Sequence, residues 1–373
     1  MNKTKNLLAA LCFFSINTLS AQYTSGFQQE YFYGNLPSAK VEAMGMADAA
    51  IGGSVASLFF NSAGLGGIED QEIMLSTSAP FYILKNSNYF FSGYARRVIP
   101  RIVAAVSVNN FFIGETTFDV NIGDDRYPVT KGNSSNLALS VAGTPVKGLY
   151  LGLNFNFFRW RLFEDVSGSM VFNMDFGALY KLELKDIKKF NQHLQFGASV
   201  NNFTASKISW EAPDGNQATN KLPIIGRFAA AYFLGTDINI PKAGEGSLDF
   251  TFTTEYQNTF NSDYYSTFSL GLETVLYKVL AVRLGYFTQS HDNLGNEVNK
   301  SRIADFTYGF GAIVPLNSLT NEKVPLSLHF DYLSLKPPSV RNDDYTKASV
   351  GRVPNMRTFT LRVVWVINEN SKL

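Results

Sequence analysis

From about residue 71 onward, hydrophobic and polar residues alternate along the chain with a period of two. In residues 148–158, GLYLGLNFNFF, the odd positions from Leu149 to Phe157 are leucine or phenylalanine, whereas the even positions from Tyr150 to Asn156 are tyrosine, glycine or asparagine. Residues 246–256 and 358–367 alternate in the same way. Because successive side chains of a strand point to opposite faces, this pattern predicts β-strands with one apolar face each.

The alternation predicts about 14 strands in all. The expected spans are 71–84, 86–97, 101–113, 134–144, 148–158, 170–184, 192–204, 222–236, 246–256, 264–276, 279–289, 304–315, 324–335 and 358–367. They are longer than the roughly 5–6 residues usual in soluble sheets. A strand that crosses a membrane at a tilt needs roughly 9–11 residues. An even number of such strands is typical of bacterial outer-membrane barrels.

The connections between the expected strands alternate between short turns and longer loops. The long loops are residues 114–133, 205–221, 290–303 and 336–354. Outer-membrane barrels have short periplasmic turns and long extracellular loops. Together with the Phe- and Leu-rich face, this favours an all-β, transmembrane antiparallel barrel over a soluble β-sandwich or propeller. We expect it in the outer membrane of a Gram-negative bacterium, in contact with outer-membrane lipid, with both termini periplasmic.

Composition supports a membrane barrel. Hydrophobic residues make up 45% of the chain, aromatic residues 14% and charged residues only 17%, against roughly 25% charged in soluble domains. The formal net charge is +1, so we expect no nucleic-acid partner. After the N-terminal segment there is no run of about 18 apolar residues that would form a transmembrane helix.

The first 21 residues have the pattern of a secretory signal peptide. Lys3 and Lys5 precede an apolar run from Leu7 to Ile16, and small residues come before Gln22. That run is too short for the alternative, an N-terminal membrane anchor. The only cysteine is Cys12, so the mature chain would have no disulfide, no thiol chemistry and no cysteine metal site.

Residues 43–67, AMGMADAAIGGSVASLFFNSAGLGG, are unlike the rest: 15 of these 25 residues are Ala, Gly or Ser. They precede the first expected strand and do not alternate. A barrel of this size encloses a lumen too wide for side chains alone to fill. We therefore predict that residues 22–70 form an N-terminal luminal hatch and that residues 71–373 form the barrel. The alternatives are a periplasmic helix outside the barrel and a GxxxG-like membrane helix.

Small residues on the expected inner strand faces would leave room for the hatch. They are Gly152, Gly177, Gly197, Ser199, Gly271, Gly309 and Gly311.

AMGMADAAIGG, then SLFFNSAGLGG, then about 14 strands resemble the FadL-type outer-membrane superfamily. The family pattern Asn-Pro-Ala-Gly-Leu matches here at residues 61–65, except that Ser62 replaces proline; Met46-Ala47 also replaces a glycine pair. The lead-in NLPSAKVEAMGM, residues 35–46, resembles the PorV/PorQ branch, which serves the type IX secretion system. The predicted hatch motif comprises Met44, Gly45, Met46, Asp48, Phe59, Phe60, Asn61, Ala63, Gly64 and Leu65.

The resemblance implies two functions, depending on the branch. PorV- and PorQ-like proteins are non-enzymatic partners in type IX secretion or surface attachment. A PorV-like role implies binding to a large translocon or attachment complex and to secreted cargo through extracellular loops. Candidate loop residues are Tyr127, Trp210 and Tyr345. The alternative is a FadL-like channel for fatty acids or other hydrophobic small molecules, which pass through the barrel wall or the lumen. A barrel with no cargo is the third reading.

The predicted luminal polar residues are Asp175, Glu255, Glu273, Arg283 and Arg362. Because lone buried charges are costly, we expect them to pair with one another around the hatch, or else to line a polar conduit. The three histidines, His193, His291 and His329, lie on separate segments without metal-ligand spacing. No set of nucleophile, base and orienting residue is evident. We therefore expect no metal, no cofactor and no enzymatic activity.

Overall fold

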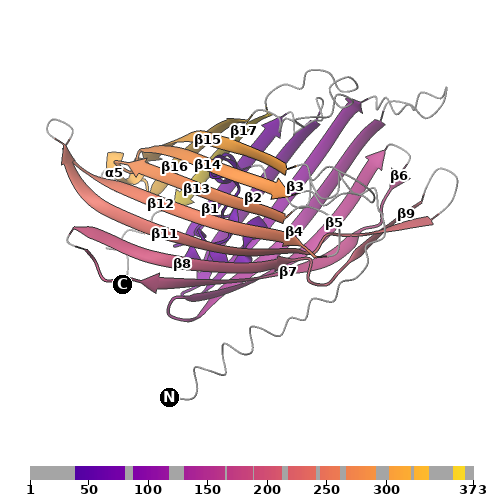
Figure 1. The fold of residues 1–373 in the computed structure, drawn as a ribbon, viewed down its shortest axis with the longest axis horizontal. Coiled ribbons are helices and arrows are strands. Elements are labelled where there is room, and N and C mark those ends of the chain that lie inside the picture. The colour runs from indigo at the N-terminus through magenta and orange to yellow at the C-terminus, as the bar shows by residue number, and fades with distance from the viewer. Residues whose placement is uncertain are drawn as a thin grey trace, which may run out of the picture.

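In the computed structural model, the strands close into an antiparallel barrel around the N-terminal segment (Figure 1). The structure describes residues 38–79, 87–116, 130–163, 166–187, 189–211, 217–240, 244–260, 266–290, 302–320, 323–335 and 356–365. The predicted signal peptide and residues 22–37 of the predicted hatch lie outside the described residues.

Fourteen strands form the ring, as the alternation predicts. They are β1 (Gln71–Ala79), β2 (Ser87–Ile99), β3 (Ile102–Thr116), β4 (Thr130–Val146), β5 (Leu149–Phe163), β7 (Val171–Glu183), β8 (Phe190–Asn201), β11 (Ile225–Ile240), β12 (Gly244–Thr259), β13 (Ser266–Leu276), β14 (Leu280–Ser290), β15 (Arg302–Pro315), β16 (Leu326–Leu335) and β17 (Met356–Trp365). The ring closes where β1 pairs with β17, from Glu72 opposite Val364 to Ala79 opposite Arg357.

Some connections differ from the expectation. The predicted loop 205–221 contains a two-stranded hairpin, β9 (Lys207–Glu211) and β10 (Gln217–Lys221). A two-residue strand, β6 (Val166–Ser167), pairs with β5, and a short helix, α5 (Leu316–Leu319), follows β15. Strand β11 extends to Ile240 and strand β12 begins at Gly244, so the turn between them is shorter than the one expected between strands 222–236 and 246–256. Backbone pairing continues here beyond the apolar stretches, because it needs only N–H and C=O groups and no apolar face.

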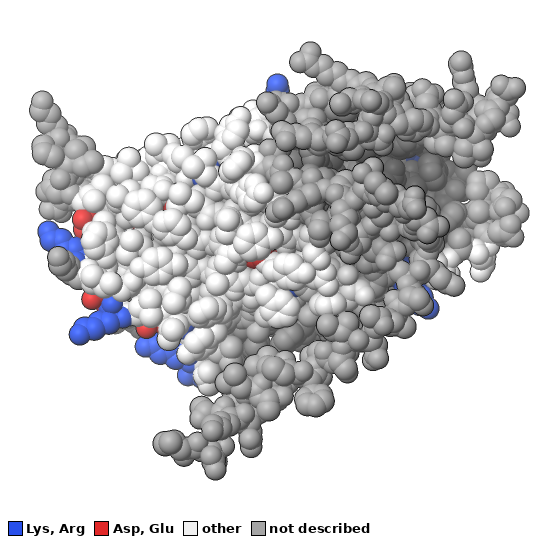
Figure 2. All heavy atoms as spheres, in the orientation of Figure 1, with Lys and Arg blue, Asp and Glu red and all other residues white. Residues whose placement is uncertain are grey.

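The outer wall of the barrel is apolar. Outward side chains such as Phe176, Phe228 and Phe306 are exposed, while their inward neighbours are buried. Figure 2 shows a broad, largely uncharged face over the strands and a group of Lys, Arg, Asp and Glu side chains at one edge of it. This closed, antiparallel barrel with an apolar outer band is the architecture of outer-membrane barrels. Within the described residues, no helix has the length and apolar character needed to span a membrane.

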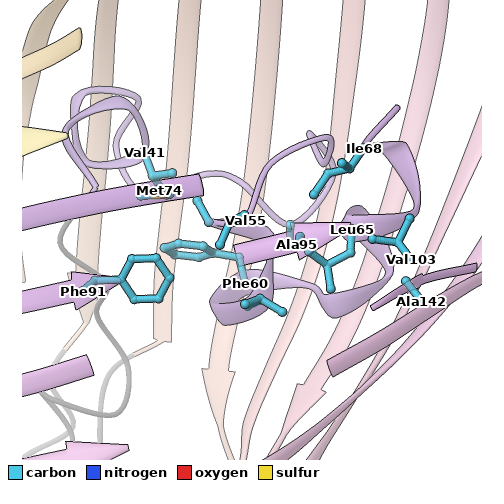
Figure 3. Close-up of a cluster of buried hydrophobic side chains, with 13 residues drawn as sticks. Val41, Val55, Phe60, Leu65, Ile68, Met74, Phe91, Ala95, Val103 and Ala142 are labelled. Atoms are coloured by element: carbon cyan, nitrogen blue, oxygen red, sulfur yellow. The ribbon is translucent and has the colours of Figure 1, made fainter. Parts of the chain in front are cut away.

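Residues 38–70, called here the hatch segment, lie inside the ring. The segment contains α3 (Ala39–Ala43), α4 (Ser57–Phe60) and a 3-10 helix, η1 (Ser62–Gly67). Its apolar side chains form one buried cluster with inward residues of the first strands, in which Leu65 lies near Val103 and Ala142 (Figure 3). The described part of the predicted hatch is therefore luminal, and neither a helix outside the barrel nor a membrane helix.

Candidate functional site: the hatch segment and the barrel wall

The barrel wall approaches the hatch backbone where the inner face carries glycine. A Cβ atom at Gly152 would overlap the backbone of Ser62, and one at Gly177 would overlap the side chain of Asn61. The same holds at Gly197, Gly271, Gly285 and Gly309, against Ala49, Met44, Gly45 and Ala43. The expected small inner residues thus receive the hatch segment, except Gly311, which faces the side chains of Asp331 and Arg283.

Glu255 on β12 holds the turn that follows α3. Its Oε2 accepts hydrogen bonds from the backbone N–H groups of Asp48 and Ala49, both at 2.9 Å. Its Oε1 lies 3.2 Å from Nη1 of Arg227 on β11, and both side chains are 2% exposed. The Arg227 guanidinium also lies 5.1 Å from the centre of the Phe60 ring. This buried ion pair therefore contacts the hatch segment at two places, the turn at Asp48 and Ala49 and the ring of Phe60.

A second ionic cluster joins α3 to the neighbouring strands of the wall. Lys40 Nζ lies 3.0 Å from Glu273 Oε1 on β13. Arg283 on β14 contacts Glu273 Oε2 at 2.5 Å through Nε and Asp331 Oδ1 on β16 at 2.6 Å through Nη1. Glu255, Glu273 and Arg283 thus each lie against a charge of opposite sign.

The other two predicted luminal residues have different partners. Asp175 on β7 is buried and accepts hydrogen bonds from amide groups: the backbone N–H of Asn202 at 2.7 Å and the side chain of Asn156 at 2.8 Å. Arg362 on β17 is half-buried, and its Nη2 lies 3.1 Å from Nδ1 of His329. Neighbouring asparagine amides therefore supply the hydrogen-bond donors around Asp175.

Asn61 in the predicted motif ties η1 to the wall. Its Nδ2 donates to the carbonyl of Ala49 at 2.7 Å and to that of Ala178 on β7 at 2.9 Å. Its Oδ1 accepts from the N–H of Ala63 at 3.1 Å, which caps η1. A shorter side chain could not cap η1 and reach β7 at once, which gives a physical reason for asparagine at this position.

Met46 adopts a left-handed backbone conformation, with φ of 68° directly after Gly45, also at 68°. This region suits glycine and costs other residues about 1–2 kcal/mol. The sequence resemblance places a glycine pair at residues 46–47, and the backbone conformation of Met46 explains why glycine suits the first of these two positions.

The remaining motif residues divide between the core and the lumen. Met44, Ala63 and Leu65 are fully buried. Phe59 is half-buried and meets Phe91 edge to face, with 6.0 Å between the ring centres. Gly64 packs against Gly52 and Ser57 within the hatch segment.

Sequence reasoning missed several residues that hold the hatch segment. Glu72 Oε1 accepts from Ser54 Oγ at 2.9 Å and from the N–H of Val55 at 3.0 Å. Thr307 Oγ1 donates to the carbonyl of Ala43 at 2.9 Å. A signal was available for Glu72, since it is a carboxylate on the polar face of the first strand, next to a segment rich in backbone donors.

Two acidic residues of the hatch segment, which belong to no wall strand, have buried side chains. Burial raises the pKa of Glu42 to about 8, against a weaker lowering by its hydrogen bond to Thr358. Burial likewise raises the pKa of Asp48 to about 7, which the nearby Lys40 charge partly offsets. Both carboxyl groups therefore take up protons near neutral pH in the folded protein.

A large apolar groove lies on the outside of the wall where the ring closes. It has a volume of about 590 Å³ and runs across β1, β15, β16 and β17. Phe310, Phe330, Tyr332 and Phe359 line it, with the small side chain of Ala312 among them. Pockets for small organic ligands typically measure about 300–1,000 Å³ and are mostly apolar.

The predicted loop contacts are only partly within the described chain. Trp210 lies on β9 of the added hairpin, whereas Tyr127 and Tyr345 lie outside the described residues. Over the described ranges there is also no group of three or more His, Cys, Asp or Glu residues placed to hold a metal ion.

The fold of this chain is similar to the folds of several solved structures. A FadL homologue of Pseudomonas aeruginosa has a TM-score of 0.46 and 11% identity, over 88% of this chain and 98% of that one. The CymD monoaromatic hydrocarbon channel has a TM-score of 0.45 and 9% identity, over 88% and 97%. The toluene transporter TbuX of Ralstonia pickettii has a TM-score of 0.42 and 10% identity, over 90% and 99%.

Identities this low say nothing about what this chain binds. No protein-family model matches the sequence, and no curated protein matches it.

Proposed function

We propose that this protein is an outer-membrane channel for hydrophobic small molecules, which dock in the apolar groove on the outer face of the barrel wall. The groove on β1, β15, β16 and β17 carries the proposal, because its volume and lining suit an alkyl or monoaromatic molecule. The hatch segment, held inside by ionic and backbone contacts, would close the lumen to polar solutes. We further propose a Gram-negative outer membrane, with both termini periplasmic.

The test is transport into lipid vesicles that contain the purified protein. Ala312→Trp fills the groove with a bulky side chain and should slow the uptake of a hydrophobic probe such as a fluorescent fatty acid or toluene. The matched control is Ala230→Trp, which puts the same side chain on the outer face of β11, away from the groove. Equal uptake by both variants and the unaltered protein would refute the groove as the route.

A second candidate is the non-enzymatic role in type IX secretion or surface attachment. The PorV/PorQ-like lead-in at residues 35–46 favours it, as does the ionic clamp of Glu255 and Arg227, which suits a permanently closed scaffold. It predicts that a large secretion protein or secreted cargo co-purifies in stoichiometric amounts from the native membrane in mild detergent. A lone barrel would exclude it.

A further inference from the structure

Three neighbouring turns at one end of the barrel combine exposed aliphatic and basic side chains. They join β2 to β3, β4 to β5 and β7 to β8, and the antiparallel pairing puts all three at the same end of the ring. Backbone hydrogen bonds hold them side by side. The N–H of Thr144 donates to the carbonyl of Arg101 at 2.9 Å, and the N–H of Lys181 donates to that of Gly148 at 2.7 Å. We call these turns the basic rim, which comprises residues 96–101, 144–148, 184–187 and 189.

Each turn of the basic rim exposes an aliphatic side chain. Val98, Val146 and Ile187 are 55%, 59% and 58% exposed, against 37% for Leu151 and 38% for Leu182 on the strands that lead to two of the turns. Exposed aliphatic surface is unfavourable in water and favourable against lipid. The three side chains therefore extend the lipid-facing apolar band of the wall to the end of the barrel.

Basic side chains accompany these aliphatic residues. Arg97 donates to backbone carbonyls of the hatch segment, but the other basic residues of the rim are exposed; they are Arg96, Arg101, Lys147, Lys185 and Lys189. Among the described residues of the rim, Asp186 is the only acidic one. The nearby Glu183 pairs with Lys181 at 2.8 Å. The basic rim therefore has a net positive charge.

The opposite end of the barrel has no such combination at its exposed apolar residues. Met170, Phe203 and Phe260 lie there beyond the strand ends and are 69%, 44% and 58% exposed. None of the three has a lysine or arginine within three residues along the chain. Exposed apolar residues at strand ends are therefore not in themselves accompanied by positive charge in this protein.

We propose that the basic rim binds the headgroups of anionic phospholipids in the leaflet at this end of the barrel, while Val98, Val146 and Ile187 contact the acyl chains. Lysine and arginine can lay their apolar stems along the lipid and extend their charge to the headgroups. Anionic headgroups attract such residues, whereas a zwitterionic headgroup has no net charge to offer. The proposal rests on the membrane barrel and is independent of the proposed transport function.

The test places a tryptophan reporter in the rim of the full chain, reconstituted into lipid vesicles. Trp160, Trp210 and Trp365 are replaced by phenylalanine, and Ile187→Trp supplies the reporter within the turn from β7 to β8. Brominated phosphatidylglycerol or brominated phosphatidylcholine is mixed into unbrominated phosphatidylcholine, and quenching of the reporter gives the relative affinity of the two lipids. Phosphatidylglycerol should bind about fivefold more tightly, the factor that one basic residue supplies.

Charge variants link this preference to the rim. Lys185→Gln combined with Lys189→Gln should lower the ratio of affinities to about one. The control is Lys207→Gln combined with Lys221→Gln, which removes the same charge from the hairpin of β9 and β10 at the opposite end and should leave the ratio unchanged. Equal quenching by the two lipids, or no quenching by either, would overturn the proposal. An equal loss of preference in the control variant would also overturn it.

If the reporter chain does not fold, native mass spectrometry of the unaltered protein decides the question. The protein in detergent is mixed with equimolar phosphatidylglycerol and phosphatidylcholine, and the lipids that remain bound are counted. Phosphatidylglycerol should be retained in excess, and Lys185→Gln combined with Lys189→Gln should reduce that excess. Equal retention of the two lipids by the unaltered protein would overturn the proposal.

Discussion

Replacing Glu255 by glutamine tests how the hatch segment is held. The change keeps the side chain's size but removes the negative charge that faces Arg227 at 3.2 Å and the backbone N–H groups of Asp48 and Ala49 at 2.9 Å. Leaving one partner of a buried ion pair unmatched costs about 3–5 kcal/mol. At 1.4 kcal/mol per factor of ten, opening of the hatch segment should become a hundredfold or more frequent.

Hydrogen exchange of the backbone amides, read by mass spectrometry, measures this opening. Peptides covering residues 43–52 should exchange much faster in Glu255→Gln, while peptides from the paired wall strands should not change. Glu183→Gln is the control, since Glu183 pairs with Lys181 but is 59% exposed. Pairing Glu255→Gln with Arg227→Met should restore part of the protection, because no unmatched charge then remains. Unchanged exchange in Glu255→Gln would refute the clamp.

Three further predictions follow from the hatch segment. Met46→Gly removes the strain of the left-handed conformation at φ 68°. After the cost of glycine's added flexibility, the change should stabilise the docked hatch segment by about 1 kcal/mol and so slow its hydrogen exchange. Faster exchange would contradict this prediction. Gly177→Ala places a Cβ against Asn61 Oδ1 and should weaken hatch docking by about 1–3 kcal/mol, whereas Gly143→Ala, with its nearest contact at 3.7 Å, should not. Because the folded-state pKa values of Glu42 and Asp48 are raised to about 8 and about 7 from 4.5 and 3.8, docking should be strongest below about pH 4 and weaken as the pH rises through 7 and 8. Glu42→Gln should flatten that dependence when hatch exchange is followed from pH 5 to pH 9 and corrected for the intrinsic rate, and an unchanged profile would contradict the assignment.

The period-two pattern was sufficient to predict the ring of strands. A strand with one face toward lipid must alternate, and Phe157 and Leu361 lie on outward faces as the pattern predicts. The hairpin of β9 and β10 has no such requirement, because polar strands such as QATNK pair through their backbones alone. This is why it escaped prediction.

The sequence was sufficient to predict that the hatch segment lies close to the barrel wall, but not which residues it contacts there. Small residues in the hatch segment and glycines such as Gly152 indicated close approach, which the structure confirms. The partners could not be read from the sequence, because they depend on how far each strand is shifted against its neighbour. Asp175 illustrates this: its partners come from β5 and from the end of β8, and only the strand pairing brings them together.

The most direct test of the channel proposal is mass spectrometry of the molecules that stay with the protein when it is purified from its native outer membrane in mild detergent. The account predicts a barrel that retains an apolar small molecule and loses it in Ala312→Trp but not in Ala230→Trp. A large secretion protein bound in stoichiometric amounts, with no apolar molecule retained, would contradict it.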